Sequence, residues 1–138
     1  ICTSMKELVW QIEQGLARDE MNLLFKKILG SNLWILDDWG TISMDRKVSE
    51  EVFDLLDRRR LSTSLILTSN RAVGEWPEMF KDPILAGAAI DRLFDHASIY
   101  TFEGRSYRLE GKRFLNKKLN YLSLIRYNIK EMKSKEIL

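Results

Sequence analysis

Two short apolar runs, each followed by polar residues, constrain the fold of this chain more than any other feature. Residues 33–36 precede Asp37 and Asp38, and residues 65–67 precede a polar segment that ends at Asn70. Runs of this length between turn residues are typical of buried strands. In open parallel sheets, ligands bind at the edge where such strands end. The sequence therefore predicts a sheet whose polar edge carries these three side chains.

Amphipathic helices are predicted between the strands. Apolar residues recur at helical spacing over residues 5–16, and a second helical segment follows. Asp45 is placed to cap a further helix, and Asp82 followed by Pro83 is typical of the start of another. Residues 97–102 are β-prone and form a third expected strand. This alternation predicts an α/β, three-layer architecture in which helices flank a mainly parallel sheet.

The positive charge of the chain is concentrated at its C-terminus. Residues 112–138 contain eight Lys or Arg and two Glu, a net charge of +6, whereas residues 1–111 have 14 basic and 18 acidic residues, a net charge of −4. Apolar residues recur at helical spacing in the basic segment, so we expect a basic amphipathic helix over residues 112–138. Such a helix can pack on the preceding domain, contact another subunit, or face DNA phosphates.

The rest of the composition excludes several classes of protein. Cys2 is the only cysteine, so an internal disulfide framework cannot form. No apolar run approaches the ~20 residues that a membrane helix needs. The sequence opens with Ile1 rather than Met, which indicates a piece of a longer protein. We expect a cytoplasmic protein with no membrane partner.

Adjacent carboxylates at a strand end suit magnesium-dependent phosphate chemistry. Mg²⁺ bound to nucleotide phosphates needs only one or two protein carboxylates. A second carboxylate, aimed differently by the alternation of the strand, can orient or deprotonate a water molecule. Asp37 and Asp38 match this division, although a strand-terminal Asp can also simply cap a turn. Asn70 can bind the water or a phosphate oxygen, or serve as an ordinary turn residue.

The order of these motifs resembles that of a known family, the AAA+ ATPases of the DnaC helicase-loader and IstB transposition-helper group. The resemblance runs through "LWILDDWG", "LILTSNRAVGEW", "DPILAGAAIDRLFDHA" and "EGRSYR", within residues 1–108. It is closest to IstB-like ATP-binding proteins. The resemblance implies a P-loop NTPase fold of AAA+ type, with ATP and Mg²⁺ as cofactors, and it implies that residues 1–111 are the C-terminal portion of the ATPase domain.

The resemblance also implies roles for individual residues at the polar edge. Asp37 corresponds to the Walker B acid on the magnesium side, and Asp38 to the acid that activates water. Asn70 corresponds to sensor 1. Arg108 or Arg105 corresponds to a second sensor that contacts nucleotide. Many members of the family carry Glu where Asp38 stands, and Asp is one methylene shorter.

Arg92, in "AIDRLFD", corresponds to the arginine finger of the family. Such a residue reaches the nucleotide of a neighbouring subunit and stabilises charge on the transferred phosphoryl group, an effect of about 10³ to 10⁵ in rate. Considered without the family, Arg92 could equally form a salt bridge on the helix surface with Asp91 or Asp95.

One family motif does not occur in these residues. Nothing matches Gly-x-x-x-x-Gly-Lys-Ser/Thr, whose backbone N–H groups cradle phosphate. We expect this motif upstream of Ile1, and "ICTS" resembles the end of the family's second strand. In the family order, 5-1-4-3-2, the strand that leads to the phosphate loop lies between the fourth and fifth strands. Either this strand exists outside residues 1–138, or the remaining strands are arranged around an open central slot. The chain alone is expected to bind ATP weakly or not at all.

Two functions remain open from the sequence. The first is an ATPase that assembles as a homo-oligomer on DNA and either regulates a transposase or loads a replicative helicase. The second is a nucleotide-independent interaction module, whose sheet and basic tail bind a protein or DNA partner.

Overall fold

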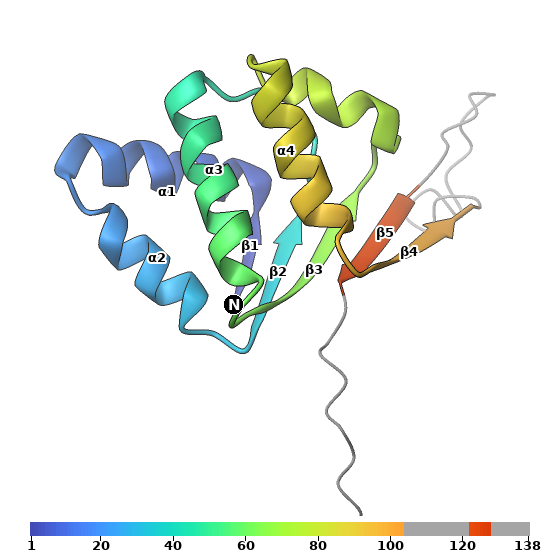
Figure 1. Ribbon diagram of the computed structural model, residues 1–138, viewed down its shortest axis with the longest axis horizontal. Helices are drawn as coiled ribbons and strands as arrows, with labels where there is room; N and C mark the ends of the chain where they lie inside the picture. The colour runs from blue at the N-terminus through green and yellow to red at the C-terminus, as the bar shows by residue number, and fades with distance from the viewer. Residues whose placement is uncertain (104–121, 128–138) are drawn as a thin grey trace, which may run out of the picture.

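The computed structural model describes residues 1–103 and 122–127, and shows one sheet covered by helices (Figure 1). In chain order the elements are β1 (Cys2–Ser4), α1 (Met5–Arg18), α2 (Met21–Leu29), β2 (Leu33–Asp37), α3 (Arg46–Arg59), β3 (Ser64–Ser69), the 3-10 helix η1 (Val73–Met79), α4 (Pro83–Phe94), β4 (Ala97–Phe102) and β5 (Leu122–Tyr127). No helix among these residues is both long enough and apolar enough to cross a membrane.

The sheet is mainly parallel, and its strand order is β1-β2-β3-β5-β4. β1 pairs with β2, and β2 with β3, in parallel, so that Leu36 lies opposite Leu67. β5 is antiparallel to both of its neighbours, β3 and β4. β4 therefore runs in the same direction as β1, β2 and β3, and β5 alone is reversed.

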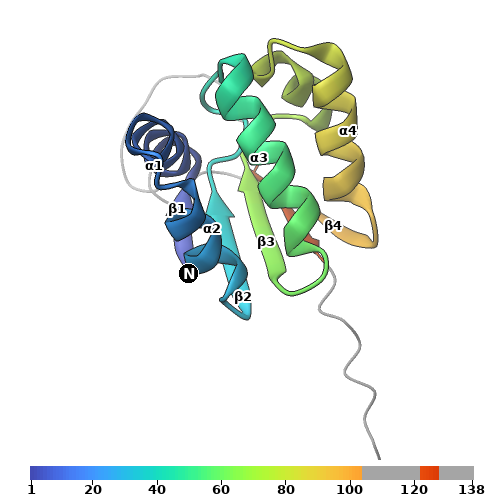
Figure 2. The ribbon, with the colours of Figure 1, turned by 60° about the vertical axis from the view of Figure 1, so that its left-hand side comes forward.

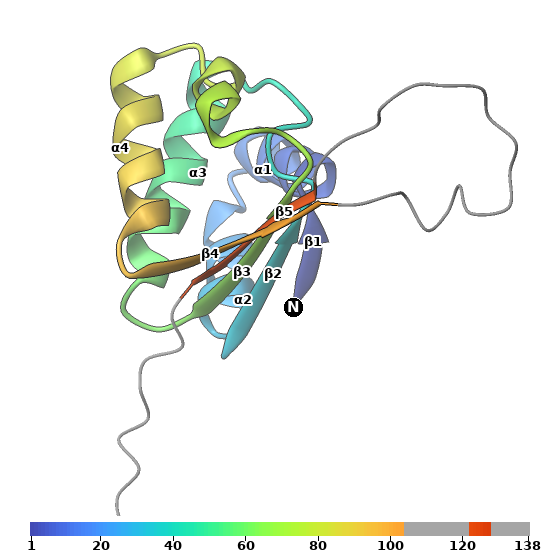
Figure 3. The ribbon, with the colours of Figure 1, turned by 90° about the vertical axis from the view of Figure 1, so that its right-hand side faces the viewer.

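The four α-helices lie on the same face of the sheet (Figures 1 and 3). The crossovers from β1 to β2, from β2 to β3 and from β3 to β4 all advance in one direction across the sheet, so right-handed connections place each helix on the same side. α3 lies between α4 and the α1–α2 pair (Figure 2). The α/β class with a mainly parallel, helix-flanked sheet is confirmed, with the described helices forming one layer.

Burial along the strands follows this arrangement. Trp34 and Leu36 on β2 and Leu65 and Leu67 on β3 are fully buried, whereas Ile66, which alternates with them, is only partly buried. The buried side chains are those that face the helices, because successive strand residues point to opposite faces.

Side chains cap the helix starts, at Asp45 and Asp82 as predicted and also at Ser4. Ser4 accepts a hydrogen bond from the backbone N–H of Glu7, and Asp45 caps α3 by accepting one from Val48 at 2.8 Å. Asp82 caps α4, whose first residue is Pro83. Each cap satisfies donors that the first helical turn leaves unpaired, so these boundaries were readable from the sequence.

The expected C-terminal helix is wrong over residues 122–127, which form strand β5. This segment, "LSLIRY", has the β-branched and aromatic content that favours strands. Because β4 does not pair with β3, the edges of these two strands face each other across one vacant position, and β5 pairs with both. The open slot, one of the two alternatives given above, is therefore not observed, because β5 fills this position. The remaining residues of the expected helix, 112–121 and 128–138, lie outside the described residues.

Candidate functional site

The acidic edge of the sheet is formed where β2 and β3 end. Asp37 is the last residue of β2, and Asp38 follows it, while Asn70 directly follows Ser69 at the end of β3. Since the two strands are parallel and Leu36 lies opposite Leu67, these polar residues lie at the same edge. Asp37, Asp38 and Asn70 are all exposed. The predicted grouping of the three residues at the C-terminal edge is confirmed.

Thr68 connects the two strand ends through its hydroxyl group. This hydroxyl donates a hydrogen bond to Oδ1 of Asp37 and accepts one from the backbone N–H of Asp38 at 3.2 Å. Asp38 has a φ of 59°, in the left-handed region, so the chain turns sharply as it leaves the strand. Thr68 therefore holds the carboxylate of Asp37 and the backbone of Asp38 at once. The sequence contained only a weak signal for this role, namely a hydroxyl residue near the end of an apolar strand.

The turn after Asp38 is fixed from behind by buried residues. The backbone N–H of Trp39 donates to the carbonyl of Thr68 at 2.9 Å, and the Ser69 hydroxyl donates to the carbonyl of Trp39 at 2.7 Å. The Trp39 ring is fully buried and packs edge to face on Trp76, with 6.1 Å between ring centroids. Gly40 follows with a φ of 88°, a conformation that other residues rarely adopt. These contacts hold the turn that follows Asp37 and Asp38 in place.

The donor set at this edge fits a magnesium ion that is held chiefly by phosphate oxygens. Among the described residues no group of three or more His, Cys, Asp or Glu could hold a metal by itself. Asp37 and Asp38 supply one or two carboxylates, as magnesium at nucleotide phosphates requires. The Thr68 hydroxyl fixes one oxygen of Asp37, so this carboxylate is held in a defined position at the edge.

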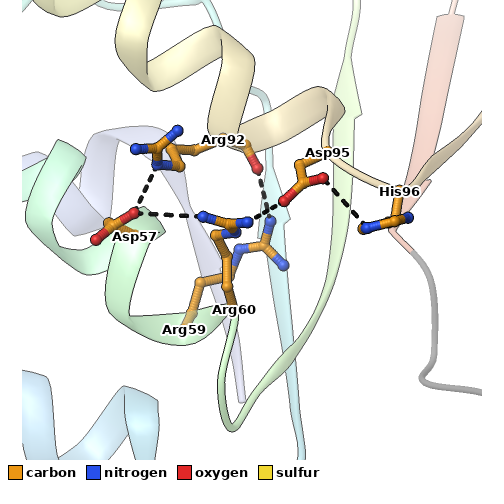
Figure 4. Close-up of polar contacts among 6 residues, drawn as sticks. All are labelled: Asp57, Arg59, Arg60, Arg92, Asp95 and His96. Carbon is orange, nitrogen blue, oxygen red and sulfur yellow. Dashed lines mark hydrogen bonds and ion pairs between the residues drawn. The ribbon is translucent and has the colours of Figure 1, made fainter.

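Arg92 lies far from this edge, near the end of α4. Its Nε donates to Oδ1 of Asp57, in the last turn of α3, at 2.6 Å (Figure 4). Arg60 lies 3.7 Å from the same Asp57 oxygen and pairs with Asp95. Arg92 therefore forms a surface salt bridge, as the alternative interpretation predicted, but its partner is Asp57 rather than Asp91 or Asp95.

The Arg92 cluster and the acidic edge lie at opposite ends of the strands. α3 leads into the first residue of β3, and α4 leads into the first residue of β4. β3 has six residues, so the two edges are about 20 Å apart. Arg92 therefore cannot reach Asp37 of its own chain. Arg105 and Arg108, the second-sensor expectation, lie outside the described residues.

The family comparison and the individual relatives agree on one family of proteins. The family described as IstB-like ATP binding protein matches residues 1–114. A relative from Pseudomonas aeruginosa, named for insertion sequence IS21 and for ATP binding, is 41% identical over 101 residues, which are 73% of this chain and 36% of the relative.

Two further relatives carry similar names. One from Geobacillus stearothermophilus, named for insertion sequence IS5376 and ATP binding, is 32% identical over 112 residues, covering 81% of this chain and 45% of the relative. One from Bacillus thuringiensis subsp. berliner, named for IS232 and ATP binding, is 31% identical over 104 residues, or 75% and 42%. The chain spans less than half the length of these curated relatives.

Proposed function

Because this chain belongs to the family of IstB-like ATP-binding proteins, we propose that the whole protein is a magnesium-dependent ATPase that assists transposition on DNA. The observation that carries the proposal is the pair of acids at the end of β2, beside Asn70 at the end of β3. Insertion sequences in the names of the relatives favour a transposase over a replicative helicase as the protein partner.

The proposed division of labour at the acidic edge follows from the contacts. Asp37, fixed by Thr68, holds the magnesium ion that accompanies the ATP phosphates. Asp38 accepts the proton of the attacking water, and Asn70 orients that water or a phosphate oxygen. Bound magnesium neutralises charge on the phosphates, and the side chains position the reacting groups around it.

Arg92 is proposed to act on the nucleotide of a second subunit. The separation of about 20 Å between its edge and Asp37 supports this assignment, because one chain cannot bring both residues to one phosphate. A guanidinium group stabilises charge that develops on the transferred phosphoryl group. Assembly into a homo-oligomer would therefore be needed for hydrolysis.

The phosphates need a further cradle that residues 1–138 do not provide. No phosphate-loop motif occurs in this sequence, so we expect this chain alone to bind ATP weakly. Sequencing the DNA upstream of the codon for Ile1 tests this point. A phosphate loop in the same reading frame supports the ATPase. Its absence would favour the alternative, an interaction module that works without nucleotide.

The first mutational test is Asp38→Asn in the whole protein. Asparagine tolerates the left-handed backbone as well as aspartate does, so the variant removes the charge without straining the turn. We expect hydrolysis to fall by about 10² to 10⁴ because the general base is lost. The affinity for ATP, measured by calorimetry, should change little.

The matched control is Asp19→Asn. Asp19 has a φ of 57° and lies at the end of α1, away from the acidic edge, so the same chemical change is made in the same backbone conformation. It should leave hydrolysis unchanged. Equal loss of activity in both variants, or none in either, would contradict the role proposed for Asp38.

A further inference from the structure

The contact between Asp57 and Arg92 is made at the inner nitrogen of the arginine. Asp57 binds Nε, the inner nitrogen of the guanidinium group, at 2.6 Å. The two terminal nitrogens of Arg92 lie beyond Nε on the same planar group, and Figure 4 draws the contact with Asp57 at Nε. The side chain of Arg92 is 37% exposed. Because Asp57 binds the inner nitrogen, the terminal nitrogens can make a bidentate contact with an oxyanion.

A second residue of α3 limits the motion of Arg92. The guanidinium carbon lies 6.0 Å from the ring centroid of Phe53, which is one helical turn before Asp57 on the same helix. The carbonyl of Arg92 accepts a hydrogen bond from the buried Arg59 at 3.2 Å. α3 thus contacts both the backbone and the head group of Arg92, which restricts the rotamers of a long and flexible side chain.

The Asp57–Arg92 ion pair is expected to contribute little to the stability of the fold, because both side chains are exposed. Asp57 and Arg92 are 44% and 37% exposed, and ion pairs at such positions add little to stability. Arg60 lies 3.7 Å from the same Asp57 oxygen and also pairs with Asp95, so the carboxylate of Asp57 is shared between two arginines (Figure 4).

We propose that Asp57 is a positioning residue for Arg92. Asp57 holds Nε of Arg92, so that the two terminal nitrogens are presented to the phosphoryl oxygens of a nucleotide bound by a second copy of this chain. The proposal deepens the proposed function and rests on the trans role of Arg92. Its physical basis is preorganisation, because a guanidinium fixed before docking loses less conformational freedom on contact.

The test compares Asp57→Ala with Asp54→Ala in the whole protein. Asp54 is the matched control, because it lies on the same helix and forms an ion pair of the same type, with Arg58 at 2.9 Å, but does not contact Arg92. Asp57→Ala should lower kcat about tenfold to a hundredfold, as expected when a catalytic group is misplaced by about 1 Å, with the KM for ATP unchanged. Asp54→Ala should retain kcat within about twofold, as is normal for an exposed pair.

Two further measurements separate positioning from a general structural effect. Asp57→Ala should add nothing to the loss caused by Arg92→Ala, because the two residues act as one unit. Self-association in ADP and aluminium fluoride, measured by sedimentation velocity, should weaken for Asp57→Ala and not for Asp54→Ala. If Asp57→Ala does not fold, Asp57→Asn replaces it, since its amide oxygen still accepts from Nε and about a tenfold smaller loss is expected.

The outcomes distinguish the two proposals. If Arg92→Ala abolishes hydrolysis while Asp57→Ala behaves like Asp54→Ala, the positioning role is overturned and the proposed function stands. If Arg92→Ala hydrolyses ATP like the unmodified protein, or the unmodified protein does not hydrolyse ATP, the trans role fails and the positioning role fails with it.

Discussion

Glu51, on α3, has an ionisation equilibrium that burial and neighbouring charges disturb. Its pKa is raised above the ordinary value, chiefly because partial burial disfavours the charged form, with Asp54 adding to the rise and Arg58 opposing it. The folded protein therefore holds this proton more tightly than the unfolded chain does. Stability from this group is present at low pH and is lost as the pH rises through the folded pKa.

Glu51→Gln should therefore stabilise the protein at pH 7. The free energy of unfolding, from urea titrations, should increase by up to about 0.5 kcal/mol, and the increase should vanish below about pH 4. Glu7→Gln is the control, because Glu7 lies on α1 rather than α3 and its carboxylate accepts a hydrogen bond from Gln11 at 2.9 Å. A gain that persists unchanged in acid would contradict the ionisation argument.

The sequence predicted some residues of the acidic edge and missed other residues, both there and around Arg92. Asp37 and Asp38 follow one apolar run directly and Asn70 follows the other after two polar residues, so their grouping required only that the two strands be parallel. Thr68 and Asp57 were missed. Thr68 is 31 residues from Asp37, and Asp57 is 35 residues from Arg92, so their roles appear only when the strand register and the packing of α3 on α4 are known.

At the scale of elements, strand β5 shows where periodicity is ambiguous. Apolar residues at helical spacing favoured a helix, but the segment 122–127 is also β-prone, and two unpaired strand edges were available to it. A strand position between β3 and β4 offers hydrogen bonds on both sides, which no isolated amphipathic helix receives. Tertiary context therefore overrode the local pattern.

The pairing of β5 predicts how a proline would act. Ile125 lies opposite Leu67 on β3 and opposite Ile99 on β4, so Ile125→Pro removes a backbone donor from the middle of the sheet. Amide hydrogens of β4 should exchange with solvent at least about tenfold faster, a loss of about 1.4 kcal/mol of local stability. Those of β1 and β2 should be unaffected.

Ile125→Val provides the comparison, because valine keeps both the backbone N–H and the preference for strands. Its exchange rates in β4 should match those of the unmodified chain. If Ile125→Pro also leaves the exchange of β4 unchanged, β5 does not support β4 in solution, and the expectation of an open slot returns.

At the scale of the whole molecule, the direction of the chain separates the two functional groups. Four strands run the same way, and their C-terminal ends carry Asp37 and Asn70, while the helices that return to their N-terminal ends deliver Asp57 and Arg92. One molecule thus presents acids at one edge of the sheet and the partly exposed Arg92 at the other. A head-to-tail contact between two copies would bring these edges together.

This polarity predicts complementation between two inactive variants of the whole protein. Asp38→Asn subunits keep Arg92 but cannot activate water, and Arg92→Ala subunits keep their acids but lack the arginine. In an equal mixture, about one quarter of head-to-tail interfaces should join an intact acidic edge to an intact Arg92, so ATPase activity should return toward roughly a quarter of normal. Steady-state hydrolysis against the mixing ratio measures this recovery.

The control is the double variant, Asp38→Asn with Arg92→Ala, mixed with either single variant. No interface in these mixtures contains both groups, so activity should remain absent. Sedimentation must show that the subunits of each mixture assemble together. If the two single variants bind ATP and assemble with one another but stay inactive, Arg92 does not act across the interface. Its contact with Asp57 at 2.6 Å is then an ordinary surface ion pair between α3 and α4.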